Sequence, residues 1–401
     1  MRQTSKTRRT IGIRGQLMGF LCFICFLLVG LFWFLSTQLL EPLYTTHIQK
    51  QLTEQAEAIV ARMDEAIERG ETLSYWAFGS QLYGEGILGL EAACASMTEP
   101  GDRVLVLDNG IYGKGFADFV SMYGGCPELY SRDYRETLDV QELENFLKEH
   151  HNYKYATVVH GDTPSGMLND ISAICPLLKK YGIMTVVDSV SASFGEPMRI
   201  SDWQIDIMCG GSQKVVSAPP GLTFVVISDD AKKAMAERKT PIASFYANLT
   251  TFAHYYEEKW FPYTMPISDI YGLRAAIDNI TADPDILVRH EKIATASRKA
   301  ITGAGLNLYL KSGFSNTVTV FEVPEETTAA AILDGVKKDY NIMLAGSFDV
   351  LAGKVIRIGH MGNNADFYNV REVFAALDGT LTKLGVPLKT SMEKIFCDNM
   401  K

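Results

Sequence analysis

The sequence predicts an α/β protein with a mainly parallel β-sheet, followed by a smaller α+β domain and preceded by one transmembrane helix. Between residues 84 and 280, short β-branched runs alternate with helical stretches, which is the pattern of a parallel sheet covered on both faces. Residues 281–401 contain long helical stretches and only two short strand-like runs. The segment 17–35 is uncharged and apolar over 19 residues, which is long enough to cross a bilayer.

Residues 1–40 are predicted to form a basic N-terminus and a membrane anchor. The first 15 residues contain five basic residues and no acid, so the positive-inside rule places the N-terminus in the cytoplasm. A cleaved signal peptide usually has a shorter apolar core and a small-residue cleavage site. We therefore expect an uncleaved, single-pass anchor through residues 17–35, which would place the rest of the chain outside the cytoplasm.

Residues 41–83 are predicted to form a helical stem and junction. Apolar residues recur there at spacings of three and four, at Leu52, Ala56, Ile59, Met63 and Ile67, as in an amphipathic helix. The layout of anchor and stem resembles that of bacterial membrane-bound sensors such as histidine kinases.

The elements of the two predicted domains follow from apolar runs and helical periodicity. In the large domain, residues 84–280, we expect strands at 104–107, 156–159, 185–187, 205–209 and 223–227, and helices at 140–149 and 171–181. In the small domain, residues 281–401, we expect helices at 285–304, 327–339 and 369–384, an alternating segment at 316–323 and a strand at 355–358.

The charge of the chain is unevenly distributed. Beyond residue 15 there are 33 basic and 47 acidic residues, a formal net charge of −14. A body this acidic is not expected to bind nucleic acid through a general basic field.

An acid and an amine follow two of the predicted strands. Asp188 ends the run VVD, and Lys214 closes the motif GGSQK after a second apolar run. Ligands bind at the carboxyl ends of strands in open α/β sheets, so both groups lie where a ligand site is expected. The pair suits pyridoxal chemistry, in which a lysine amine condenses with the cofactor aldehyde and a carboxylate keeps the pyridine nitrogen protonated. For these two residues alone, the alternatives are an ordinary ion pair or two solvated loop residues.

Six motifs occur in order from Gly84 onward: NGIYG, HGDTPSG, VVDSVSASFG, GGSQK, APPGL and KVIRIGHMG. Together they resemble class V aminotransferases of the fold-type I pyridoxal-phosphate group, the relatives of alanine–glyoxylate and serine–pyruvate transaminases. The resemblance covers about four-fifths of the chain, and ordered matches over such a length are more specific than one short motif. It implies a homodimeric fold-type I enzyme that moves an amino group to a small α-keto acid, pyruvate or glyoxylate.

The resemblance also assigns roles to individual residues. Lys214 would form the Schiff base with the cofactor and then carry protons as general base and acid. Asp188 would pair with the pyridine nitrogen. Arg357 would bind the substrate carboxylate, because a planar guanidinium matches a carboxylate bidentately.

Further cofactor contacts are expected from the motifs that follow the other strands. By the resemblance, Tyr112 would stack on the ring, Thr163 would bind the ring hydroxyl, and Gln213 would contact the phosphate end or the ring. Asp162 and Ser165 would shape the turn of HGDTPSG, whereas His160 would satisfy nearby backbone groups. The remaining predicted contacts come from the turn of Gly84, Glu85 and Gly86 and, in the neighbouring subunit, from Thr264.

The turn GEG departs from many relatives, which have small hydroxyl residues there to hold the cofactor phosphate with helix N-terminal amides. Glu85 would place a carboxylate beside a phosphate of nearly two negative charges. At about 4 Å and an effective dielectric near 20, one such charge pair costs roughly 4 kcal/mol. Together with the motifs YGKGF, HGDTPSG and RIGHMG, this turn makes the sequence most similar to the pyridoxamine–pyruvate transaminases, which use unphosphorylated pyridoxamine as a substrate. Two hypotheses stay open: pyridoxal 5′-phosphate as cofactor, or unphosphorylated pyridoxal or pyridoxamine as bound substrate.

Residues 1–83 lie outside the resemblance, in place of the N-terminal arm and first helix of relatives. They are either a genuine anchor and stem or a misjoined segment, in which case the protein would be cytoplasmic. A membrane-anchored, catalytically impaired binding or sensor module is the alternative from another class. A lyase or desulfurase is the alternative among enzymes, but Cys126, Cys175 and Cys397 show no setting for a mobile nucleophilic cysteine.

Overall fold

The structure is a computed structural model that describes residues 82–259 and 261–401. The predicted anchor and residues 41–81 of the predicted stem lie outside the described residues. No helix in the described ranges is long and apolar enough to cross a membrane. Residues 82 and 83, at the end of the predicted stem, form a short strand, β1 (Leu82–Tyr83).

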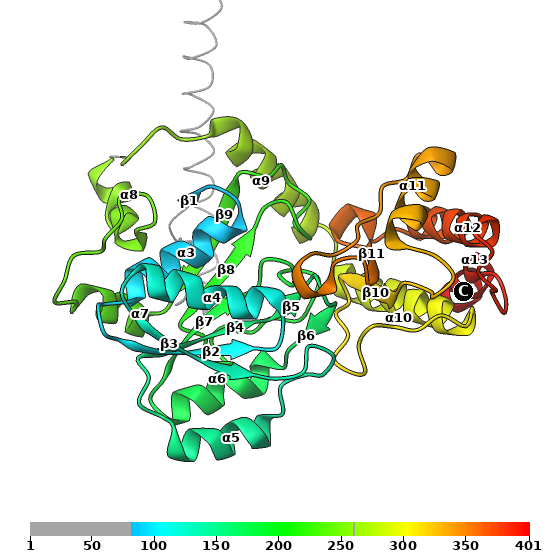
Figure 1. Cartoon of the computed structure of the whole chain (residues 1–401). Helices are drawn as coiled ribbons and strands as arrows, with labels where there is room; N and C mark the ends of the chain where they lie inside the picture. Colours follow the sequence, from blue (N-terminus) through cyan, green and yellow to red (C-terminus); the bar gives the residue numbers. More distant parts are fainter. Residues whose placement is uncertain (1–81, 260) are drawn as a thin grey trace, which may run out of the picture. The chain divides into compact units, whose positions relative to one another are not determined.

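Seven strands form the central sheet, in the order β1-β9-β8-β7-β4-β2-β3 (Figure 1). The pairs β2–β3, β2–β4, β4–β7 and β7–β8 are parallel, whereas β8–β9 and β1–β9 are antiparallel. The prediction of a mainly parallel sheet is therefore confirmed. The strands after β1 are β2 (Arg103–Asp108), β3 (Cys126–Ser131), β4 (Tyr155–Val159), β7 (Met184–Asp188), β8 (Ile207–Gly211) and β9 (Leu222–Ile227).

Helices cover both faces of this sheet. In Figure 1, α3 and α4 lie on one face and α5 and α6 on the other. Because successive side chains of a strand point to opposite faces, Val104 and Val106 of β2 join the core beneath α3 and α4, and Leu105 and Leu107 join the core beneath α5 and α6. The helices of this section are α3 (Gly86–Met97), α4 (Ile111–Met122), α5 (Val140–Glu149), α6 (Ile171–Lys180), α7 (Asp229–Ala236), α8 (Tyr255–Glu258) and α9 (Ile267–Thr281). Short elements complete it: β5 (Gly161–Asp162), β6 (Met167–Leu168) and the 3-10 helix η2 (Leu249–Phe252).

The C-terminal section has its own core and a two-stranded antiparallel sheet. Strands β10 and β11 pair with Val320 opposite Arg357, and one buried cluster joins α10 to α11, α12 and α13. This arrangement is the α+β section that the sequence predicts. Its elements are α10 (Ile286–Gly303), β10 (Val318–Glu322), α11 (Ala329–Tyr340), η3 (Asp349–Leu351), β11 (Val355–Gly359), η4 (Gly362–Asn364), α12 (Phe367–Lys383) and α13 (Met392–Met400).

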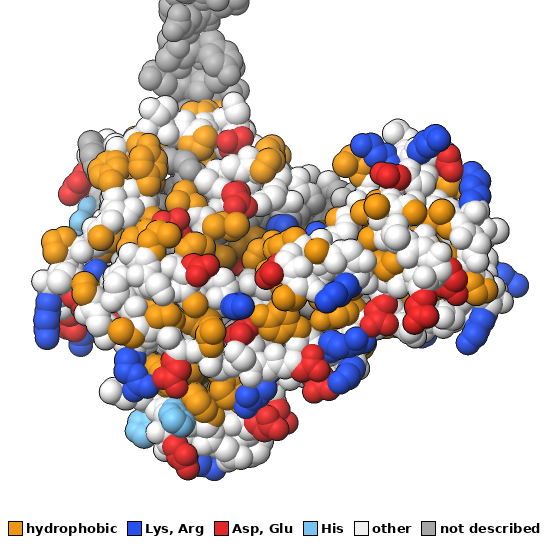
Figure 2. Space-filling model, in the orientation of Figure 1, with side chains coloured by type: hydrophobic (Ala, Val, Ile, Leu, Met, Phe, Trp, Pro, Cys, Tyr) orange, Lys and Arg blue, Asp and Glu red, His pale blue; other side chains and the backbone are white. Residues whose placement is uncertain are grey.

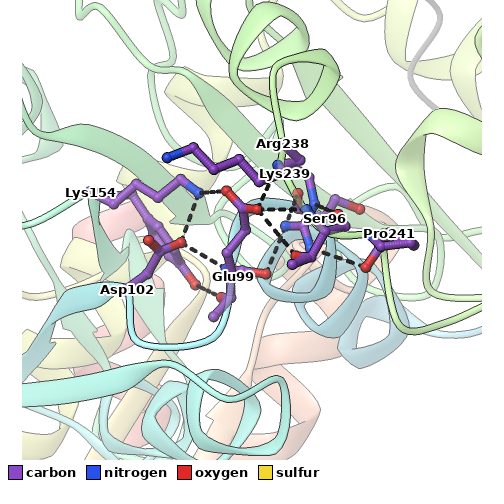
Figure 3. A network of polar contacts seen from close by, with 10 residues as sticks. Ser96, Glu99, Asp102, Lys154, Arg238, Lys239 and Pro241 are labelled. Carbon is purple, nitrogen blue, oxygen red and sulfur yellow. Dashed lines mark hydrogen bonds and ion pairs between the residues drawn. The ribbon is translucent and has the colours of Figure 1, made fainter.

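A polar network fixes the loop after α7 to the C-terminal end of α3 (Figure 3). Arg238 donates through Nη1 to the carbonyl oxygen of Ser96 at 3.0 Å. Glu99 accepts hydrogen bonds from two loop amides at 2.8 and 3.0 Å, and its carboxylate lies 3.2 Å from Nζ of Lys154. Burial opposes ionisation of Glu99, but these partners outweigh it and lower its pKa to about 2. The network thereby anchors the loop that directly follows α7.

Candidate active site

The predicted acid and amine lie at the same edge of the sheet. Asp188 is the last residue of β7, and it pairs in parallel register with Cys209 of β8. Lys214 lies in the turn that follows β8, where its carbonyl oxygen accepts a hydrogen bond from the Ser217 amide at 3.0 Å. The two adjacent parallel strands thus deliver both groups to the edge where α/β proteins bind ligands.

Asp188 is a buried carboxyl group whose charge is poorly stabilised by the protein alone. Its side chain is 4% exposed, and Oδ1 accepts a hydrogen bond from the Val190 amide at 2.9 Å. Burial raises the pKa of Asp188 to about 7, with Asp162 adding to the rise while the Val190 amide and Lys214 oppose it. A protonated pyridine nitrogen would supply the missing cationic partner.

Burial also changes the acidity of Lys214. Its pKa is lowered, first by burial and then by the nearby positive charge of Arg357, whereas Asp188 and Glu85 oppose this change. A lowered pKa increases the neutral fraction of an amine, and the neutral amine is the form that attacks a carbonyl group. Three predicted site residues, Arg357, Asp188 and Glu85, are thus close enough to Lys214 to influence its charge.

The HGDTPSG turn is built around Asp162, which is 2% exposed. Oδ2 of Asp162 accepts hydrogen bonds from the Ser165 hydroxyl at 2.5 Å and the Ser165 amide at 3.1 Å. Oδ1 accepts a hydrogen bond from the Tyr112 amide at 3.2 Å, which ties the start of α4 to this turn. Gly110 is needed for this approach, because a Cβ atom there would lie 2.7 Å from Cγ of Asp162. The fold therefore brings Tyr112 beside the buried Thr163.

Arg357 projects from β11 of the C-terminal section toward this group of residues. Nε donates a hydrogen bond to the carbonyl oxygen of Gly346 at 2.6 Å, and its backbone amide donates to Ala345 at 2.8 Å. Burial lowers the pKa of Arg357, while Tyr112 and Asp162 raise it. Among the described residues no side chain pairs with its two Nη atoms, so they are available to a ligand carboxylate.

Glu85 and Gln213 meet at the N-terminal end of α3. Nε2 of Gln213 donates a hydrogen bond to Oε2 of Glu85 at 3.3 Å. Oε1 of Gln213 is buried and has no hydrogen-bond partner within residues 82–259 and 261–401. Close packing explains Gly86, because a Cβ atom at this position would lie 2.7 Å from Cγ2 of Val190. At Gly84, an added Cβ would lie 2.4 Å from Cδ2 of Leu88.

The sequence also singles out His160 and Thr264, and one of them is buried while the other is exposed. His160 is buried, and its Nδ1 lies 3.1 Å from Oγ of Ser189. Burial lowers the pKa of His160 to about 4, so its imidazole is neutral at pH 7. Thr264 is exposed in the loop before α9, and its predicted contact with a neighbouring subunit stays a prediction.

The structure adds one aromatic residue that the sequence does not indicate. The ring of Phe348 lies 6.0 Å from the ring of Tyr112, with 62° between the ring planes. Phe348 is in an irregular segment nine residues before Arg357, and no motif marks it. Its position near the site depends on how that segment folds beside β11.

Comparisons with known proteins agree with this fold. The family model of class V aminotransferases matches residues 91–310. Pyridoxamine–pyruvate transaminase of Mesorhizobium japonicum is 34% identical over 76% of this chain and 79% of its own length. Alanine–glyoxylate aminotransferase of Felis catus is 31% identical over 75% of this chain and 74% of its own length.

Solved structures support the same relationship. Pyridoxamine–pyruvate aminotransferase from Mesorhizobium loti superposes with a TM-score of 0.76 at 32% identity, covering 80% of this chain and 83% of that chain. Ureidoglycine–glyoxylate aminotransferase from Bacillus subtilis superposes with a TM-score of 0.77 at 26% identity, covering 80% and 84%. The chain belongs to the class V aminotransferases, a family of fold-type I enzymes that depend on pyridoxal 5′-phosphate.

Proposed function

We propose that this protein transfers an amino group to a small α-keto acid, pyruvate or glyoxylate, with a pyridoxal-class group held at Lys214. The observation that carries the proposal is the convergence of three groups: the buried carboxyl of Asp188, the amine of Lys214, whose pKa burial lowers, and the guanidinium of Arg357. The names of the pyruvate- and glyoxylate-specific relatives support this choice of acceptor.

The residues present fit a pyridoxal group. The carboxylate of Asp188 would pair with the protonated ring nitrogen. This cationic partner would stabilise the negative charge of Asp188, which burial disfavours. Tyr112 offers an aromatic face to a flat ring, and the buried Thr163 offers a hydroxyl beside it. When bound, a pyridoxal group supplies an electron sink for the substrate carbon.

The other steps are carried out by side chains of the chain. Lys214 moves the proton at the reacting carbon, and its lowered pKa favours this role because it increases the fraction of neutral amine that can accept a proton. Arg357 binds the keto-acid carboxylate through its Nη atoms and so fixes which carbon faces Lys214. Its hydrogen bond to Gly346 limits the rotation of the guanidinium.

A specific observation favours the unphosphorylated ligand as a second candidate. The carboxylate of Glu85 and the unpaired carbonyl oxygen Oε1 of Gln213 are both hydrogen-bond acceptors. A phosphate brings negative charge and further acceptor oxygens, whereas the hydroxymethyl group of pyridoxal or pyridoxamine brings an O–H donor. The pair therefore suits pyridoxamine as an amino donor that enters and leaves, as in the pyridoxamine–pyruvate relatives.

One assay tests both candidates. Purified full-length protein is incubated with pyridoxamine and pyruvate, or with alanine, glyoxylate and pyridoxal 5′-phosphate, and alanine, glycine and pyridoxal are quantified. Pyridoxal and alanine formed in equal amounts in the first mixture would support the pyridoxamine candidate. Glycine formed only when the phosphate form is present would support ordinary cofactor-dependent transamination. No product in either mixture would contradict the proposed function.

We also propose a homodimer and retain the membrane anchor as a proposal. Phe245 and Tyr246 are 60% and 53% exposed on the loop between α7 and η2, and a second copy is the partner that would cover them. Light scattering of the full-length protein should give the mass of two chains.

Membrane fractionation of the full-length protein tests the anchor. The control is a variant in which three leucines of residues 17–35 are replaced by arginine.

A further inference from the structure

The segment 345–351 contacts two parts of the candidate site, Arg357 of β11 and the HGDTPSG turn. Gly346 accepts the hydrogen bond from Nε of Arg357, and Ala345 accepts one from the Arg357 amide, at 2.6 and 2.8 Å. The next residue, Ser347, donates through Oγ to the carbonyl oxygen of Pro164 in the HGDTPSG turn at 3.4 Å. Consecutive residues of this segment therefore contact the carboxylate-binding arginine and the turn that carries Thr163.

Phe348 follows directly and presents its ring to the site. The ring meets Tyr112 edge to face at 6.0 Å, yet the side chain remains 42% exposed. Three residues later, Leu351 is 2% exposed and packs in a cluster with Val320. The backbone is thus fixed on both sides of Phe348, and its ring is held beside Tyr112 without being buried by the protein.

The chemistry of an α-keto acid leaves one direction for its side chain. The carboxylate of the keto acid binds the guanidinium of Arg357, and its carbonyl carbon must face Lys214. The remaining substituent therefore points away from both groups, toward other residues of the site. Phe348 is two residues beyond the carbonyl oxygen that holds Arg357, and its ring lies beside Tyr112.

We infer that Phe348 sets the size and polarity of the keto-acid side chain that the site accepts. Its ring leaves room for a hydrogen atom or a methyl group and closes the space that a longer chain needs. It offers no hydrogen bond, so a second carboxylate would lose its hydration without compensation. The inference rests on the proposed function and goes beyond it, because it names the residue that excludes larger and dicarboxylic acceptors.

The test compares acceptors in the full-length protein with one amino donor. The values of kcat/KM are measured for pyruvate, 2-oxopentanoate and 2-oxoglutarate. In Phe348→Ala, the ratio for 2-oxopentanoate over pyruvate should rise at least about tenfold, since one methylene in an apolar pocket changes selectivity by about 10- to 200-fold. Phe348→Leu should give an intermediate ratio, mainly through KM. Met343→Ala, which is matched as an apolar truncation at an 80% exposed position in the loop just before the segment, should leave the ratio unchanged.

The outcomes separate this inference from the proposed function. An unchanged ratio in Phe348→Ala, with turnover of pyruvate retained, would overturn the role of Phe348 and leave the transaminase proposal intact. A wild-type protein that transfers no amino group to any of the three acids or to glyoxylate would overturn both. Equal rises in Phe348→Ala and Met343→Ala would also contradict the inference, because they would show a general loosening of the loop.

Discussion

The side-chain amide of Gln213 donates a hydrogen bond to the carboxylate of Glu85, with 3.3 Å between Nε2 and Oε2. This contact orients the other end of the amide, so that the buried Oε1 of Gln213 lacks a partner among the described residues. A carboxylate and an unsatisfied acceptor thus lie together at the N-terminal end of α3, although a helix N-terminus generally favours an anion such as phosphate. This contact supports the hypothesis that Glu85 disfavours a phosphorylated ligand.

Glu85→Gln should shift ligand preference toward the phosphorylated form. The substitution keeps the size of the side chain and removes the charge that repels a phosphate. Because Glu85 is exposed to solvent, screening reduces the repulsion well below the roughly 4 kcal/mol expected at an effective dielectric near 20. We expect the affinity for pyridoxal 5′-phosphate relative to pyridoxal to rise about tenfold, as measured by equilibrium dialysis. Glu149→Gln, at an exposed position at the end of α5, is the matched control. Equal relative affinities in wild type and Glu85→Gln would refute the repulsion argument.

The buried carboxyl of Asp188 should make a contribution to the stability of the unliganded protein that is lost as pH rises toward 7. Its pKa is about 7 in the folded protein against an ordinary value of 3.8, so the folded state holds a proton that the unfolded state has released. The contribution of Asp188 to the free energy of unfolding is fully present below about pH 4 and is lost as pH rises through about 7. Each unit of difference between the folded and unfolded pKa corresponds to about 1.4 kcal/mol.

Urea unfolding at pH 5 and pH 8 measures this effect. Asp188→Asn should show a smaller loss of unfolding free energy between the two values than wild type. Other buried groups contribute equally in both proteins: Glu196, whose pKa burial raises to about 7, acts in the same direction as Asp188, and His160, whose pKa burial lowers to about 4, acts in the opposite direction. Asp118→Asn, on the exposed side of α4, should behave as wild type. Bound pyridoxal should flatten the wild-type dependence, because a cationic partner favours the Asp188 carboxylate. An identical pH dependence in Asp188→Asn and wild type would argue against a raised pKa.

Arg357→Lys should weaken the binding of the keto acid more than it slows turnover. A lysine retains the charge but loses the planar pair of Nη donors and the Nε hydrogen bond to Gly346. A hydrogen bond to a charged group contributes about 1.5–3 kcal/mol, so we expect KM for pyruvate to rise about 10- to 100-fold. Steady-state kinetics at saturating amino donor would measure this change. Arg199→Lys, a surface control, should leave KM unchanged, and an unaltered KM in Arg357→Lys would exclude the carboxylate-binding role.

Most of the central sheet could be predicted because its strands are continuous apolar runs. The predicted segment 104–107 lies within β2 (Arg103–Asp108), and the predicted helix 140–149 matches α5. The edge strand β3 has no such signal, since only Tyr130 among its six residues is buried and Pro127 interrupts the pattern. Short strands such as β1 depend on pairing with a distant strand, β9, which no local pattern reveals.

The candidate site could be predicted only as far as its motifs extend. Asp188 and Lys214 are recognisable because each follows an apolar strand, and the fold brings them together. The contact between Gln213 and Glu85 joins residues 128 positions apart, so it could not be foreseen from spacing. Phe348 approaches Tyr112 only because its segment is bound to β11 and to the HGDTPSG turn, which is a tertiary relationship.

Covalent trapping tests whether Lys214 forms a Schiff base with a pyridoxal group. Full-length protein is mixed with pyridoxal or with pyridoxal 5′-phosphate, treated with borohydride and digested, and the modified peptide is identified by mass spectrometry. We expect one major modification, at Lys214, that disappears in Lys214→Ala and persists in the surface variant Lys114→Ala. Modification spread over exposed lysines with both ligands, or unchanged labelling in Lys214→Ala, would contradict a pyridoxal-dependent transaminase built around Asp188 and Lys214.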